Sequence, residues 1–269
     1  MTMEIAVAKG EVVEKTVELT TDKVLHIHIG HGGKLRLLLC GTCQQLTTEA
    51  IVGEGASLDL CDLDTNPADI TCQHLLHIRQ EANSQAFVQS ISLGQGSTSN
   101  TTRVDLCGEG AELNLDGLVI ASGTQHIDNH TYVTHTVPHC TSYQLFKYVL
   151  DEQAQGTYAG LVKVNPGAHH THSEQTNHNL CATRQTRMFA QPQLEIYNDD
   201  VRCNHGSSTG QLDESALFYM RQRGISLREA RLLLMTAFTS EVINHIRIPA
   251  LQERLHELVE KRFRMNNKE

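Results

Sequence analysis

Alternating apolar and polar residues form many short stretches in the first two thirds of the chain. Leucines recur at every second position in 35–39, 58–60 and 113–115, which places them on one face of a strand. Gly-x-Gly turns precede these stretches, and the segments 53–60 and 108–115 are near copies of one another. Short strands with recurring glycine turns suit a β-helix, in which each coil stacks on the next, but also a sandwich or barrel.

The irregular spacing of the glycine turns leaves both folds open on pattern alone. For a β-helix we expect stacked parallel strands from about residue 20 to 206, inside a β-rich core that spans residues 1–206. Four leucines should then point into the stack: Leu58, Leu60, Leu113 and Leu115.

The apolar period becomes helical past this β-rich core. Asp213 can cap a first helix, and Ser226-Leu-Arg-Glu229 is a capping box that opens a second one. A third amphipathic segment follows Pro249, which cannot continue the preceding helix. We therefore expect a small C-terminal α-helical domain over residues 207–269.

Composition excludes several classes of protein. The 269 residues carry a net charge of −9 with no tryptophan, and no basic stripe is present, so we expect no nucleic-acid binding. The N-terminus lacks the basic and apolar regions of a signal peptide, and no apolar run reaches the roughly 18 residues of a membrane span. We expect a cytoplasmic protein whose eight cysteines are reduced.

The segment around Cys203 and His205 is the first candidate site. The two residues stand at i and i+2, so on a strand their side chains share a face, and Gly206 can turn the chain to expose them. Thiolate and imidazole suit iron, zinc and iron–sulfur chemistry, but one pair cannot complete a four-ligand site. The pattern predicts a half-site that needs a partner. The alternative is a histidine in a strand-end turn that orients the following helix.

Two further clusters contain metal-binding residue types. His170-Thr-His172 with Glu174, in the histidine run 169–172, resembles part of a cupin metal motif, and Cys40-Gly-Thr-Cys43 has the spacing of a redox or half-zinc motif. An exposed polar strand and packed thiols are the simpler interpretations. These clusters define the alternative function, a stand-alone His-rich metalloenzyme with a β-helix or cupin-like fold.

An ordered series of motifs covers about residues 126–245. It includes Asp128-Asn-His-Thr131, His135, Ser142, Gln144-Leu145, Gly160, Gln175-Thr-Asn177, Asn179-Leu180, Pro192-Gln-Leu-Glu-Ile-Tyr197, Cys203, His205-Gly206, Phe218-Tyr219, Arg221 and Arg223-Gly-Ile225. This series is similar to the SufB/SufD family of iron–sulfur cluster assembly proteins, and more closely to SufD. The chain departs from the usual Cys-Ser-His-Gly-Ala-Thr pattern with Cys203-Asn-His-Gly-Ser-Ser208. Strand-type repeats also begin where the family commonly has a helical N-terminal domain.

The resemblance implies a right-handed parallel β-helix followed by a small C-terminal helical domain. It implies a scaffold subunit, not an enzyme, that pairs with a SufB-type paralogue and a SufC-type ABC ATPase. His205, with Cys203 beside it, would lie at the paralogue interface and contact iron transiently. No cofactor is expected to be tightly bound, and an iron–sulfur cluster would be shared with the partner only transiently.

The resemblance and the helical pattern together suggest where partners bind. No P-loop or Rossmann fingerprint occurs in the chain, so any nucleotide must be bound by a partner. We expect the ATPase on the helical region 213–263, because a helix layer is the only element that is separable from the strand stack. A homodimer can stand in for the heterodimer in isolation, because a β-helix has open ends with unpaired strand edges. The partner-binding candidates are Leu217, Phe218, Tyr219, Arg221 and Arg223.

Overall fold

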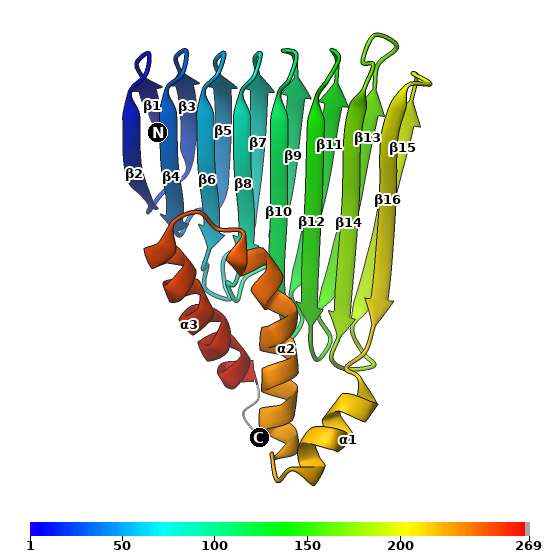
Figure 1. Ribbon diagram of the computed structural model, residues 1–269. Helices are drawn as coiled ribbons and strands as arrows, with labels where there is room; N and C mark the ends of the chain where they lie inside the picture. The colour runs from blue at the N-terminus through cyan, green and yellow to red at the C-terminus, as the bar shows by residue number, and fades with distance from the viewer. Residues whose placement is uncertain (267–269) are drawn as a thin grey trace.

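The computed structural model describes residues 1–266, which form a β-solenoid with three helices on one side (Figure 1). The strands alternate between two eight-stranded sheets, one containing the odd-numbered strands and the other the even-numbered strands, each in chain order. Neighbouring strands pair in parallel throughout, for example β10 with β8 and β12. This arrangement confirms the predicted parallel solenoid and excludes the sandwich.

The strands and helices have the following bounds. They are β1 (Thr2–Val7), β2 (Val12–Leu19), β3 (Lys23–Ile29), β4 (Lys34–Gly41), β5 (Gln45–Val52), β6 (Ser57–Asp64), β7 (Cys72–Gln80), β8 (Gln85–Ser92), β9 (Thr98–Leu106), β10 (Glu112–Ala121), β11 (His126–His135), β12 (Thr141–Leu150), β13 (Gln155–Val164), β14 (Thr171–Cys181), β15 (Arg187–Ile196), β16 (Val201–Gly210), α1 (Glu214–Gln222), α2 (Leu227–Asn244) and α3 (Pro249–Asn266). The stack therefore begins at Thr2 rather than at about residue 20.

Tight turns at one end of the strands keep the coils in register. Glycine supplies the left-handed backbone in several of these turns, as at Gly32 with φ 64°, because it has no Cβ to clash. The backbone N–H of Gly32 donates to the carbonyl of Glu54 in the next coil at 2.9 Å. In later coils His139 and His170 adopt the same left-handed backbone, with φ of 59° and 56°.

Inward-facing side chains stack in columns along the solenoid, and the columns change character from one end to the other. One column of the even-numbered sheet runs Leu37, Leu60, Val88, Leu115, Gln144, Gln175, His205, and its neighbour runs Leu35, Leu58, Ala86, Leu113, Ser142, Ser173, Cys203. The four predicted leucines are at most 1% exposed, which confirms their inward orientation. Burial of one such side chain stabilises the fold by roughly 1.5–3 kcal/mol, so the apolar coils hold the stack together.

The two ends of the solenoid also differ in polarity and exposure. Inward residues of the first coil, such as Val7 and Leu19, are only 2% exposed. At the other end β15 and β16 are edge strands, and every residue of β16 from Asn204 to Gly210 is exposed. The C-terminal end is therefore an open, polar end.

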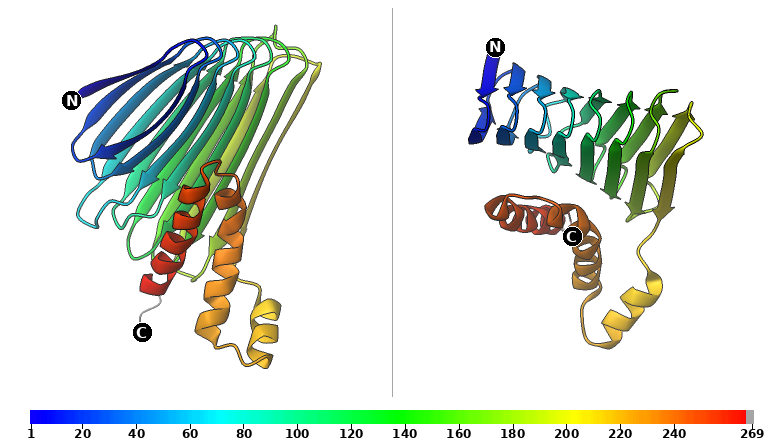
Figure 2. Two further views of the ribbon diagram at one scale, coloured as in Figure 1. Left: turned by 60° about the vertical axis from the view of Figure 1, so that its left-hand side comes forward. Right: turned by 45° about the horizontal axis from the view of Figure 1, so that its top comes forward.

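Helices α2 and α3 form a hairpin on the outer face of the even-numbered sheet, with α2 over β10 and β12 (Figures 1 and 2). Apolar helix residues such as Val242 join one buried cluster with outward-facing Leu63 and Leu118 of the sheet. An ion pair links Lys147 of β12 to Glu241. The helical region and the solenoid therefore share a core, and removal of residues 213–269 would expose the outer face of the sheet.

Strand β16 runs through the predicted domain boundary at residue 206. Gly206 lies inside the strand without a positive φ, so the predicted turn at this position is wrong. The chain leaves the solenoid after Gly210. Asp213 then caps α1, since its Oδ1 accepts from the backbone N–H of Ser215 at 2.8 Å, as expected from the sequence.

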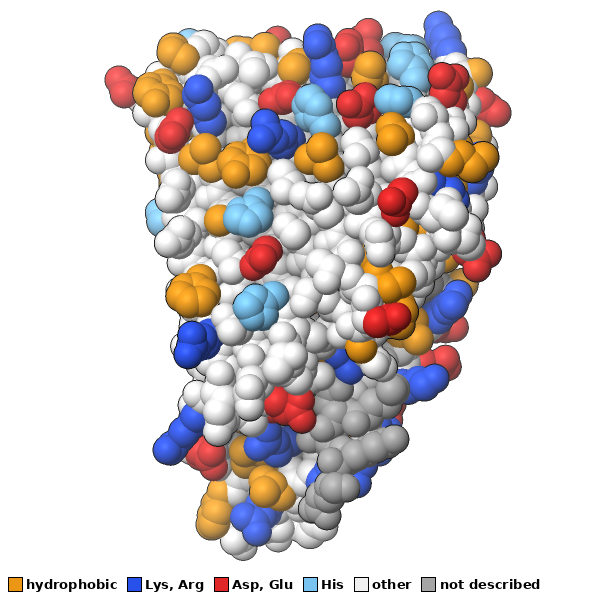
Figure 3. Space-filling model, turned by 180° about the vertical axis from the view of Figure 1, so that it is seen from behind, with side chains coloured by type: hydrophobic (Ala, Val, Ile, Leu, Met, Phe, Trp, Pro, Cys, Tyr) orange, Lys and Arg blue, Asp and Glu red, His pale blue; other side chains and the backbone are white. Residues whose placement is uncertain are grey.

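No helix of the described part of the chain lies on the outer face of the odd-numbered sheet, which presents a mixture of polar, charged, histidine and apolar side chains (Figure 3). His26 and His28 of β3 are on this face, as their alternation with apolar residues indicates. Within residues 1–266, no helix is both long and apolar enough to cross a membrane.

Candidate functional site

Cys203 and His205 end the two inner columns at the open end of the solenoid. In the register of β14 and β16, Cys203 stands beside Ser173 and His205 beside Gln175. Ser173 and Gln175 point into the solenoid and are at most 1% exposed, so residues aligned with them on the parallel neighbour face the same way. The structure thus brings the thiol and the imidazole to one face, at the mouth of the solenoid.

The two side chains differ in exposure. Cys203 is half-buried against the main hydrophobic core, whereas His205 is exposed. Burial raises the pKa of the Cys203 thiol, although a backbone hydrogen bond with Ser173 opposes the shift. The thiol therefore stays neutral and packed, while the imidazole of His205 is free to meet a ligand from outside.

A row of buried polar groups leads from the interior to Cys203. The Nε2 of His135 lies 2.9 Å from the Ser142 hydroxyl, which in turn lies 2.9 Å from the Ser173 hydroxyl in the next coil. Burial lowers the pKa of His135 to about 4, so its imidazole is neutral at physiological pH. These groups build a hydrogen-bonded layer directly behind the site.

The inner polar residues are functional candidates that no single sequence motif assigns to the site. The signal that points to them is the motif series at 126–245, to which His135, Ser142, Gln144 and Gln175 all belong. Polar residues at inward positions of strands need partners when buried. Such a series inside predicted strands therefore indicates a polar interior. Its position beside His205 becomes clear only from the register between the coils.

The predicted partner-binding residues lie on or next to α1, which extends away from the solenoid (Figure 1). Phe218 and Tyr219 are 64% and 59% exposed, and Arg221 is exposed as well. Arg223 donates to the Tyr219 hydroxyl at 2.8 Å and stacks over its ring. Leu217 differs, because it is 5% exposed and packs into the helical core. It therefore supports the helix instead of lining its surface.

His169 and His170 lie in the exposed turn before β14, whereas His172 is the second residue of that strand. His170 pairs with Asp200 at 3.0 Å, and His172 pairs with Glu174 at 3.3 Å. The two pairs stay separate, and no group of three or more histidine, cysteine or acidic side chains in residues 1–266 is arranged to hold a metal ion.

The two cysteines of the Cys40-Gly-Thr-Cys43 motif point to opposite sides of the sheet. Cys40 packs in the cluster beneath the helices, whereas Cys43 is buried in the core of the solenoid. They cannot form the local pair that their spacing suggests, because the wall of the solenoid separates them.

Comparison with known proteins gives the family of this chain. The family model described as SUF system FeS cluster assembly, SufBD core domain, matches residues 12–238, a range that holds both Cys203 and His205. The chain belongs to this family. Among its relatives, the iron-sulfur cluster assembly protein SufD of Escherichia coli is 32% identical over 63% of this chain and 40% of its own length.

Two other SufBD proteins match more of the chain. An iron-sulfur cluster assembly SufBD family protein of Synechocystis is 30% identical over 80% of this chain and 47% of its own length. The SufD protein of Bacillus subtilis is 26% identical over 81% of this chain and 50% of its own length. The chain thus spans about half of the length of these SufBD relatives.

Proposed function

We propose that this SufBD protein is a SufD-like scaffold subunit that pairs with a SufB-type paralogue through the open end of the solenoid. The observation that carries the proposal is the change of the inner columns from leucine to polar residues, which end at Cys203 and the exposed His205. Edge strands β15 and β16 offer unpaired backbone groups at the same end, and such edges readily pair with another chain. In isolation a second copy of the chain can occupy this edge.

His205 supplies one half of an interface site in this proposal. A single imidazole beside a neutral packed thiol is too few ligands for iron, so the partner must complete the site. The growing iron–sulfur cluster is the substrate of the assembled complex and is not a resident cofactor of this chain. The chain itself performs no covalent chemistry at this site, and we place it in the cytoplasm.

The ATPase partner docks on α1. Phe218 and Tyr219 form an exposed aromatic pair on a helix that projects from the body, and such residues are enriched in protein interfaces. Because α2 packs on both α1 and the solenoid, movement of a SufC-type ATPase bound at α1 can reach the sheet. ATP-driven movement is thus coupled to the interface that contains His205.

Substitution of His205 tests the interface site. His205→Ala should leave co-purification with a SufB-type protein unchanged but reduce complementation of a strain lacking SufD under iron limitation. His178→Ala is the matched control, because His178 is a histidine on the adjacent strand β14 that points outward. Cys203→Ala should have a smaller effect than His205→Ala. Full complementation by His205→Ala would exclude His205 from the proposed interface site. Loss of the complex would instead show that His205 has a purely structural role.

Substitution on α1 tests the docking surface without truncation of the shared core. Phe218→Ala with Tyr219→Ala should weaken binding of a SufC-type ATPase by at least about tenfold, as expected for central aromatic residues. Leu227→Ala on α2, where Leu227 is 47% exposed, is the control for loss of a surface apolar group. Equal binding by both variants would place the docking surface elsewhere.

Metal analysis separates the proposal from the metalloenzyme alternative. The chain purified without partners should contain much less than one tightly bound metal ion per protomer. About one tightly bound ion in the isolated protein would favour a stand-alone metal site.

A further inference from the structure

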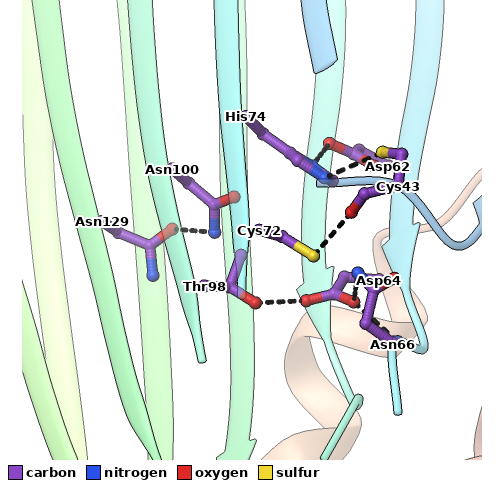
Figure 4. A network of polar contacts seen from close by, with 9 residues as sticks. All are labelled: Cys43, Asp62, Asp64, Asn66, Cys72, His74, Thr98, Asn100 and Asn129. Atoms are coloured by element: carbon purple, nitrogen blue, oxygen red, sulfur yellow. Dashed lines mark hydrogen bonds and ion pairs between the residues drawn. The ribbon is translucent and has the colours of Figure 1, made fainter. Parts of the chain in front are cut away.

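A second cluster of sulfur and imidazole groups lies buried in the solenoid, four strands away from the edge strand β15 (Figure 4). His74 of β7 is 5% exposed, and its Nδ1 lies 2.8 Å from Oδ2 of Asp62. Its Nε2 lies 3.8 Å from Sγ of Cys43. The thiol of Cys72 donates to the carbonyl oxygen of Cys43 at 2.8 Å. One imidazole therefore lies between a carboxylate and a thiol, and a second thiol lies against the first cysteine.

The two thiols have different surroundings. Burial opposes a charge on His74, but the charge and hydrogen bond of Asp62 outweigh it and raise the pKa of His74 well above its usual value. The imidazolium can then direct its Nε2 proton at the sulfur of Cys43, which lies 3.8 Å away. Burial raises the pKa of Cys72, so this thiol stays protonated. The contacts thus distinguish the two sulfurs, because the Nε2 of His74 lies against Cys43 while the thiol of Cys72 donates to a backbone carbonyl.

Other cysteines lack this combination. Cys140 is equally buried, but its thiol donates to backbone carbonyls. Cys61 lies beneath the helices, where burial and neighbouring Asp62 raise its pKa. By contrast, His74, which pairs with Asp62, forms hydrogen bonds with the thiols of Cys43 and Cys72. Cys43 also precedes exposed Gln44 in the connection between β4 and β5, so a small reagent needs only local opening to reach it.

We propose that Cys43 is a reactive thiol, with His74 and Asp62 as positioning residues, and that a hydroperoxide oxidises it to a disulfide with Cys72. The site is separate from His205 and does not depend on the function proposed above.

The reaction balances with hydrogen peroxide as the oxidant. The Cys43 thiolate attacks one peroxide oxygen, the S–O bond forms, the O–O bond breaks, and the departing hydroxide takes the Nε2 proton of His74 to become water. The sulfur of Cys72 then attacks the sulfenic acid of Cys43, the S–S bond forms, and the departing hydroxide takes the proton that Cys72 releases. The imidazole regains the proton that Cys43 had lost to solvent. Two thiols and one peroxide give one disulfide and two waters.

Peptide mapping of the oxidised full chain tests this assignment. The reduced protein is treated with hydrogen peroxide, quenched with N-ethylmaleimide in denaturant, and digested. We expect a Cys43–Cys72 cross-link to form before any other, and before oxidation of the control thiol Cys140. Cys72→Ser should stop the reaction at a sulfenic acid on Cys43, which dimedone captures.

Isosteric carboxamide substitutions test the role of the positioning residues. Asp62→Asn should slow cross-linking by at least about tenfold, since it removes the charge that holds the imidazolium. Asp64→Asn is the matched control, because Asp64 lies on the same strand and bonds to Thr98 and Asn66 instead of His74. Equal rates for the two variants, or first cross-links at other cysteines, would overturn the proposal. If Asp62→Asn fails to fold, the alkylation rates of Cys43 and Cys140 in the wild-type protein test the proposal instead. Equal rates for the two thiols would refute it.

Discussion

Substitution of Gly117 by alanine should disrupt packing where the inner columns change from apolar to polar. Gly117 of β10 faces inward beside Phe146 of β12. A Cβ atom at this position would lie 2.1 Å from Cδ1 and 2.3 Å from Cε1 of the Phe146 ring. The ring is 1% exposed and packs 4.7 Å from the ring of fully buried Tyr158. Phe146 therefore cannot withdraw without displacement of a second aromatic side chain.

The expected destabilisation follows from these distances. Carbon atoms in contact are normally about 3.5–4.0 Å apart, so the ring must move by more than about 1 Å. Overpacking of this kind typically costs about 1–3 kcal/mol. Alanine also restricts the unfolded chain, which offsets about 0.4–1 kcal/mol of that cost. At about 2–4 °C per kcal/mol for a protein of this size, Tm should fall by several degrees.

Urea and thermal denaturation followed by circular dichroism measure this effect. Gly167→Ala is the control, since a Cβ there meets nothing within 4 Å and Gly167 does not have a positive φ. It should leave stability unchanged or raise it slightly. Phe146→Leu should relieve the clash, so that a double-mutant cycle with Gly117→Ala gives a favourable coupling of about 0.5–3 kcal/mol. Equal stability of Gly117→Ala and Gly167→Ala, or purely additive effects, would refute the packing argument.

Three further predictions concern stability and pH. Leu115→Ala removes a fully buried side chain, so it should cost about 2–5 kcal/mol in urea denaturation, and a cost below about 1 kcal/mol would contradict its place in the core. The lowered pKa of His135, about 4 against 6.5, means that its stabilising contribution is present above pH 6.5 and is lost as the pH falls toward 4. His135→Gln should therefore flatten the loss of stability between pH 7 and 4.5 by an amount on the order of 3 kcal/mol, and an unchanged profile would show that the imidazole is not buried neutral. The hydrogen bond with Asp116 raises the pKa of His245, against the effect of burial, so its contribution is full below pH 6.5 and is lost as the pH rises through the folded-state value. Hydrogen exchange in α2 should accelerate from pH 6 to pH 8 beyond the intrinsic rate increase, and His245→Gln should abolish that excess.

The sequence by itself determined the local structure and the family. Alternation at Leu58 and Leu60 fixes which side chains share a strand face, because the period of two is a property of one strand alone. Asp213 and Ser226 predict helix starts, because a cap satisfies backbone donors within a few residues. The motif series likewise identifies the inner polar residues as a group, although it does not give their positions relative to His205.

Only the tertiary structure decided which coils stack on which, and therefore what lies beside each functional residue. Alternation separates two faces, but the irregular coil lengths leave the register between coils undetermined in the sequence. Register places Gln175 beside His205 and carries β16 past Gly206 as an edge strand. The tertiary structure also buries Leu217 while Phe218 remains exposed, since the docked helices decide which face of α1 is covered.

The separation of Cys40 from Cys43 has the same cause. Spacing along the chain suggests that these two cysteines form a pair, but the wall of the solenoid divides them, and Cys43 meets His74 and Cys72 from later strands instead. Chemistry that depends on contacts between coils is set by long-range packing, which a local pattern of residues does not encode.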